Sequence, residues 1–92
     1  MTKIIDKERL EKEFVRTERA LHVIKVISDK KEAHELFDLA TRYYNDAKYF
    51  QQKDDFASAF GALNYAFGLL DAGAKLKLFD VTADKELFIV DE

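Results

Sequence analysis

The sequence predicts an all-α protein: an up-down-up three-helix bundle with a short C-terminal apolar tail packed on it. Three observations lead to this fold. The 92 residues include no proline and only three glycines, whereas strands need turns and turns need those residues. Two short polar breaks divide the chain into three long segments. Apolar residues recur at helical spacing in each segment.

Length and composition predict one domain, residues 1–92. A chain of this length buries a single core, and its 48% apolar and 36% charged residues are typical of a soluble globular protein. The absence of cysteine excludes disulfides and thiolate metal sites and fits a reducing compartment. No stretch is apolar enough for a signal peptide or a bilayer span. We therefore expect a cytoplasmic protein without a membrane partner.

The first helix is expected over about residues 3–27. Its apolar positions follow four-three-four-three spacing on one narrow stripe: Leu10, Phe14, Thr17, Leu21 and Ile24. Charged residues between them indicate that the rest of this helix faces water. Ser28 or Asp29 can cap the next helix, and Glu32 follows Asp29 at the spacing of a capping box.

The second helix is expected over about residues 30–52. Its apolar residues fall within an arc of roughly 160° at 100° per residue. They are Leu36, Phe37, Leu39, Ala40, Tyr43, Tyr44, Ala47 and Phe50. The opposite face is polar and includes Tyr49, which makes Tyr49 a candidate contact residue for another protein.

The third helix is expected over about residues 55–78, with Asp54 or Asp55 as its cap. Because its apolar arc covers more than half the circumference, we expect this helix to pack on both others. A seam of small residues, which includes Gly73, would let a neighbouring helix approach closely. The tail, residues 79–92, contains Leu87, Phe88, Ile89 and Val90. These residues should pack over one end of the bundle, with engagement of another chain as the alternative.

Two glycines of the third helix, Gly61 and Gly68, share its only polar side with Asn64. Each glycine costs a helix interior about 1 kcal/mol relative to alanine. The favoured interpretation is that the tail, or the end of the first helix, lies across this side. A docking strip for a second protein or a second copy of the chain is the functional alternative. Tolerated drift is the third.

Four cations align along the first helix at three-four-three spacing: Arg9, Lys12, Arg16 and Arg19. Such a stripe could contact phosphates or an acidic partner. However, glutamates interleave with it, and the net charge of −3 argues against nucleic acid as a partner. A solvated helix face is the simpler interpretation.

No catalytic, cofactor or metal motif is found in the sequence. His22 and His34 lie on different predicted helices, with no cysteine to complete a zinc site. All three glycines lie in the third helix, so no glycine-rich phosphate loop exists. We expect neither an enzyme nor a bound cofactor.

Several segments carry a resemblance to a known family. "YYNDAKYF", "KDDFASAF" and "YAFGLLDAGAKLKLFDV", with the tail "DKELFIVDE", resemble the small archaeal family called domain of unknown function 357. The resemblance implies a three-helix bundle and supplies no catalytic residues. Taken together, the sequence predicts a non-catalytic module for protein interaction or self-association. The alternative is a nucleic-acid- or nucleotide-associated accessory domain that uses the cationic stripe.

Overall fold

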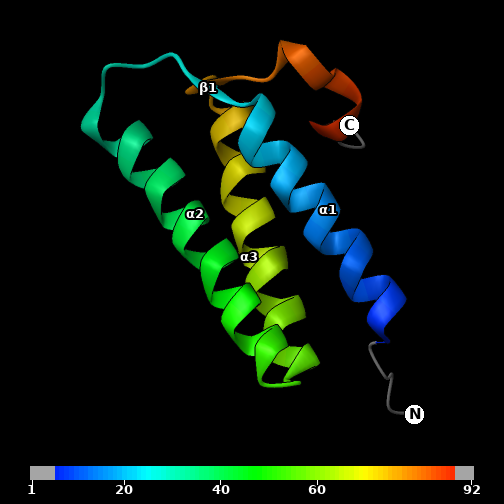
Figure 1. Ribbon diagram of the computed structural model, residues 1–92. Coiled ribbons are helices and arrows are strands. Elements are labelled where there is room, and N and C mark those ends of the chain that lie inside the picture. Colours follow the sequence, from blue (N-terminus) through cyan, green and yellow to red (C-terminus); the bar gives the residue numbers. More distant parts are fainter. Residues whose placement is uncertain (1–5, 89–92) are drawn as a thin grey trace.

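The computed structural model describes residues 6–88, and it is mostly helical, as predicted. Its elements, in chain order, are helix α1 (Lys7–Val23), strand β1 (Lys25–Val26), helix α2 (Lys31–Gln52), helix α3 (Phe56–Lys75), strand β2 (Phe79–Asp80) and the 3-10 segment η1 (Thr82–Phe88). Figure 1 shows α1 and α2 on either side of α3, with successive helices running in alternating directions. α3 packs along the length of α2 and also against α1, whereas α1 and α2 touch little.

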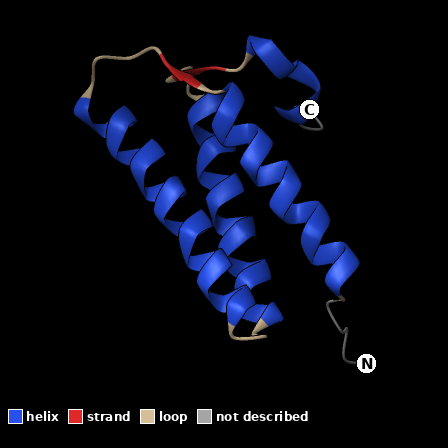
Figure 2. Cartoon of the chain, viewed as in Figure 1, coloured by secondary structure: helices blue, strands red, loops and turns tan. Residues whose placement is uncertain are grey.

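The two strands form a small antiparallel sheet at one end of the helices (Figure 2), which the sequence did not predict. Lys25 pairs with Asp80 and Val26 with Phe79. The first helix therefore ends at Val23, and its predicted extension to residue 27 is wrong. Ile24 is already extended, with ψ of 135°. The apolar pattern continues through this region because the strand residues also contribute to the core. At the other end of the predicted helix, residues 3–5 lie outside the described part.

The N-cap of α3 is as predicted, whereas the N-cap of α2 is not. Asp55 is the N-cap of α3, and its carboxylate accepts a hydrogen bond from the Ser58 backbone N–H at 3.1 Å. Neither Ser28 nor Asp29 caps α2, whose N-cap is Lys30 without a side-chain bond. Ser28 instead accepts a hydrogen bond from the Lys30 backbone N–H at 3.1 Å, which closes a local turn ahead of the helix.

α3 ends at Lys75 and not at residue 78, because Lys77 adopts a left-handed conformation with φ of 60°. The chain then turns back, and the Leu78 N–H donates to the Gly73 carbonyl at 3.0 Å. A Cβ built on Gly73 would collide with the ring of Phe79. Gly73 is thus structural, as predicted, but it accommodates an aromatic side chain from β2 in place of a neighbouring helix.

The described part of the tail packs on its own chain. Phe88 is buried, and its ring stacks on Phe67 of α3 with centroids 5.5 Å apart and planes 8° apart. η1 also contacts α1 through an ion pair between Arg19 and Asp84. Ile89 and Val90, which were part of the predicted apolar tail, lie outside the described residues.

The core has two clusters along the helices, one towards each end of α3. The end nearer the α2–α3 loop contains Leu10, Tyr44, Ala47, Ala59, Ala62 and Leu63. The end nearer the sheet contains Ala20, Ile24, Ala40, Leu70, Phe79 and Phe88. Thr17 of α1 is fully buried, and its hydroxyl has no hydrogen-bond partner among residues 6–88. A buried, unpaired hydroxyl costs about 1–3 kcal/mol.

We expect Thr17→Val to raise the free energy of unfolding by about 1 kcal/mol, because valine fills the same volume without the unpaired hydroxyl. Thr41→Val is the matched control, since the Thr41 hydroxyl donates to the Phe37 carbonyl at 3.0 Å and its loss should bring no gain. Urea denaturation measures both. Destabilisation by Thr17→Val would mean that the hydroxyl is hydrogen-bonded.

Asp80 makes the free energy of unfolding depend on pH in the acid range. Its carboxylate accepts hydrogen bonds from the Thr82 N–H at 2.9 Å and hydroxyl at 2.7 Å, which lower its pKa below the ordinary value of 3.8. Because its pKa is lower in the folded chain, the ionised Asp80 carboxylate stabilises the fold above pH 3.8. This stabilisation is lost as the pH falls below 3.8 and through the lowered pKa. The stability advantage over Asp80→Asn should therefore shrink in acid, as measured by thermal denaturation between about pH 2 and 7. A constant difference over that range contradicts this.

Candidate functional site

The side of α3 that points away from the core is open. We define the α3 outer face by its exposed residues: Ala57, Gly61, Asn64, Tyr65, Gly68, Ala72 and the adjoining Leu76. A Cβ added at Gly61 or Gly68 would meet nothing within 4 Å. The expectation that the tail or the end of the first helix lies across this side is therefore wrong for the described residues. The tail packs beside it, where Phe88 meets Phe67.

This face is also free of charge over most of its length. No Asp, Glu, Lys or Arg occurs between Phe56 and Leu70, although 36% of the whole chain is charged. Two large apolar side chains stand out on the face, Tyr65 with 52% of its surface exposed and Leu76 with 69%. The α3 outer face thus combines flat backbone at the glycines with exposed apolar groups.

The structure brings together three of the four predicted protein-contact residues. Gly61, Asn64 and Gly68 share the α3 outer face, whereas Tyr49 lies on α2. Tyr49 is 57% exposed, and its ring contacts Phe50 of the same helix at 5.7 Å between centroids. It does not belong to the α3 surface.

Tyr65 is the surface residue that sequence reasoning missed. It was not among the predicted contact residues because tyrosine counts towards the wide apolar arc of α3, but its ring lies at the edge of the α2–α3 pair. There it meets Tyr43 of α2 with centroids 4.5 Å apart. Its position four residues after Gly61 was the signal that could have placed it on the outer face.

Three of the four cations of α1 form ion pairs among the described residues. Lys12 lies 3.9 Å from the Glu8 carboxylate, and Arg16 lies 2.9 Å from Glu13. Arg19 pairs with Asp84 of η1. These ion pairs reduce the net positive charge along this face of α1.

Two of these arginines also cover aromatic rings of α3. The Arg9 guanidinium lies 5.0 Å from the centroid of Phe60, and that of Arg16 lies 3.9 Å from the centroid of Phe67. Such contacts are worth about 0.5–2 kcal/mol, depending on how far the cation is desolvated. Arg9 and Arg16 therefore help to hold α1 on α3.

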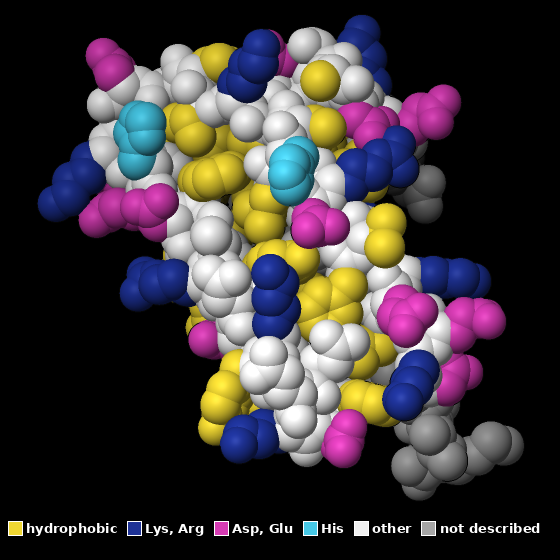
Figure 3. Space-filling view, in the orientation of Figure 1, with side chains coloured by type: hydrophobic (Ala, Val, Ile, Leu, Met, Phe, Trp, Pro, Cys, Tyr) yellow, Lys and Arg dark blue, Asp and Glu magenta, His cyan; other side chains and the backbone are white. Residues whose placement is uncertain are grey.

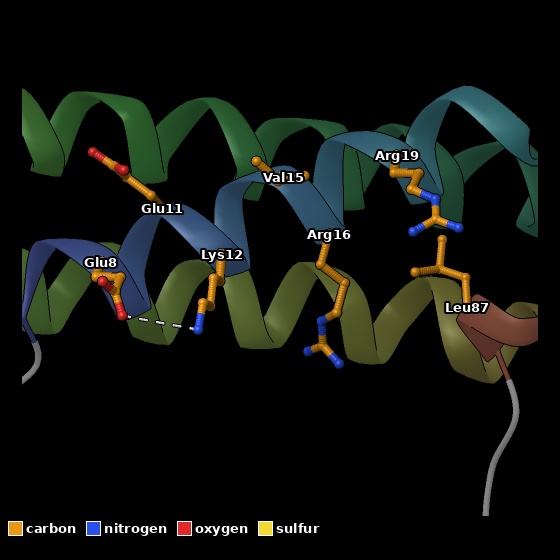
Figure 4. A pocket seen from close by; sticks show the side chains of 7 residues that line it. All are labelled: Glu8, Glu11, Lys12, Val15, Arg16, Arg19 and Leu87. Atoms are coloured by element: carbon orange, nitrogen blue, oxygen red, sulfur yellow. Dashed lines mark ion pairs between the residues drawn. The ribbon is translucent and has the colours of Figure 1, made fainter.

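A shallow groove of about 530 Å³ follows the outer side of α1 and ends at η1. Figure 4 shows Val15, Lys12 and the arginines along it, with Arg16 directed towards α3 and Arg19 towards Leu87. Glu8 and Glu11 also line the groove, so both signs of charge are present. Figure 3 shows the same mixture of cations and anions over the visible face.

No group of three or more His, Cys, Asp and Glu side chains in residues 6–88 could hold a metal ion. Burial, followed by the charge of nearby Glu18, raises the pKa of Tyr44, and hydrogen bonds from Ser58 lower that of Asp55. These shifts arise from packing and helix capping. Among the described helices, none has an apolar stretch sufficient to cross a membrane.

Residues 14–79 match the sequence model of a family described as "Protein of unknown function (DUF357)". The chain belongs to the DUF357 family. The DUF357 match includes β1, α2, α3 and part of α1, and so the α3 outer face lies within it, whereas Arg9, Lys12 and η1 do not. The chain matches no curated protein. Since the family has no stated activity, it assigns no role to any residue.

The glycines give a paired test of these surfaces. Gly68→Ala should raise the free energy of unfolding by about 1 kcal/mol, because the face is open and alanine is the better helix former. Gly73→Ala should lower it by about 1–3 kcal/mol, because its methyl group collides with Phe79. Chemical denaturation at low protein concentration measures both. Destabilisation by Gly68→Ala would mean that something in the chain covers that face.

Proposed function

We propose that this DUF357 chain is an up-down-up three-helix bundle that works in the cytoplasm as a non-catalytic module for protein interaction or self-association. The α3 outer face is its contact surface. The observation that carries the proposal is the open side of α3, whose exposed residues are uncharged up to Ala72, on a helix that is apolar on its other sides as well. A helix that is hydrophobic all round is normally buried.

The two glycines favour a helix of the partner as the element that docks on this face. The distance between packed helices depends on the side chains at the contact. Gly61 and Gly68 carry none, so the backbone of a docking helix can come close to α3 at these two points. Asn64 adds a hydrogen-bonding group beside them. Two exposed glycines together cost about 2 kcal/mol of helix stability, which close docking can offset.

The nucleic-acid-associated alternative has weaker support. Phosphate binding needs Lys or Arg side chains that are free to contact the phosphate groups and to displace the counterions around them. Arg16 and Arg19 are instead engaged by Glu13 and Asp84, and a phosphate would have to displace these carboxylates. No observation of comparable weight favours catalysis.

A photocrosslinking amino acid in place of Asn64 tests the proposal in cells of the source organism. We expect a covalent adduct with a second polypeptide, identified by mass spectrometry as another protein or as the same chain. The matched control places the same amino acid at Glu35, an exposed residue of α2 that lies among charged neighbours.

The two positions must differ for the proposal to hold. Adducts specific to position 64 support a docking surface on α3. Equal yields at positions 64 and 35, or none at either, contradict it. Circular dichroism of both variants establishes that the helices are intact.

A further inference from the structure

α3 carries two seams of the same spacing on opposite sides. The buried seam consists of Ala59, Leu63, Ala66, Leu70 and Gly73, at four-three-four-three intervals, and all of these residues are buried. The open seam consists of Gly61, Tyr65, Gly68, Ala72 and Lys75, at the same intervals, and all of these residues are exposed. This spacing is the one by which helices pack along their length at a shallow angle. The first seam is covered by α1, α2 and the Phe79 ring. In the second seam the Tyr65 ring contacts Tyr43 of α2 at its edge, while nothing among the described residues lies over Gly61 and Gly68.

We propose that the open seam docks against the open seam of a second copy of this chain, which gives a two-fold symmetric dimer. This inference rests on the proposed function and names its partner. A symmetric dimer places one surface against itself, so the surface must be complementary to its own copy. The open seam meets this condition up to Ala72, because it has no charge to repel its counterpart.

The outer faces of the other two helices do not fit this seam. Glu8, Glu11 and Lys12 are exposed on α1, and Glu35 and Asp38 are exposed on α2. Docking either face on the open seam would remove charges from water without a partner on α3. Among the helices of this chain, α3 itself is the matching partner.

The single charge of the seam selects the direction of pairing. In a parallel dimer every seam residue meets its own copy, so Lys75 would face Lys75. In an antiparallel dimer centred on Gly68, Lys75 faces Gly61 of the second copy, since each lies seven residues from the centre. The glycine leaves room for the lysine stem, and the two backbones come closest where Gly68 meets Gly68. The geometry points to the antiparallel dimer.

The absence of cysteine from the sequence permits a direct test by single substitutions. Gly68→Cys should form a disulfide between copies under mild oxidation, because the two positions meet at the symmetry axis. A mixture of Gly61→Cys and Lys75→Cys chains should form mixed disulfides. Glu35→Cys, exposed on the outer side of α2, is the control for random collision. Light scattering of the unmodified chain should give about twice the 10.7 kDa mass of one copy.

A further variant separates loss of docking from loss of folding. Gly68→Arg should leave the helical content unchanged, because nothing lies within 4 Å of the added side chain. It should weaken the dimer at least about tenfold, since it brings two like charges together at the axis.

Three results would overturn the inference. The first is a mass of 10.7 kDa at every concentration, with Gly68→Cys no faster to cross-link than Glu35→Cys. The second is a dimer that Gly68→Arg leaves intact. The third is Lys75→Cys cross-linking to itself faster than Gly68→Cys, which would mean parallel pairing. A monomer whose position 64 captures a different protein in cells overturns only the dimer, whereas a monomer that captures nothing overturns the proposed function as well.

Discussion

The packing of α1 and α2 on one small-residue side of α3 governs the rest of this structure. Ala59 and Ala66 are completely buried there, so the neighbouring backbones approach α3 closely. Larger side chains come from the flanks, as where Phe14 of α1 meets the edge of Tyr44 of α2 at 6.0 Å. α1 and α2 flank the small-residue side of α3, and no further helix of the described chain is left to cover its outer face. The open face is thus a consequence of the topology.

The flank of α3 that faces α1 explains the behaviour of the cationic stripe. Phe67 lies on this flank, where Arg16 of α1 and Phe88 of the tail both contact its ring. Arg19 adds an ion pair to Asp84 in the same tail segment. Residues whose spacing suggests phosphate binding therefore hold α1, α3 and η1 together. An arginine has both a charge and a flat apolar surface, and here both are used within the chain.

Features that depend on local interactions were predictable, and those that depend on distant ones were not. α2 and α3 begin within one residue of the predicted positions, because polar breaks and the Asp55 cap act within a single turn. The end of α1 was wrong, because β1 pairs with β2 from the far end of the sequence. Apolar residues continue from helix to strand there, and hydrophobicity does not distinguish the two over so few residues. The role of Gly73 required the position of the Phe79 ring, which comes from the same pairing.

A helical wheel predicts which residues of α3 lie on the candidate surface. Gly61, Asn64 and Gly68 oppose the buried seam by rotation alone, so their exposure follows from the sequence. Whether another element covers these residues does not follow from the sequence, because it depends on where the other elements lie. The wide apolar arc of α3 predicts neighbours on most of its circumference, yet α1 and α2 leave its outer face uncovered among the described residues. A helix with more apolar surface than the described chain covers gains stability when a second chain packs on it, and this supports the proposed role of the α3 outer face in association.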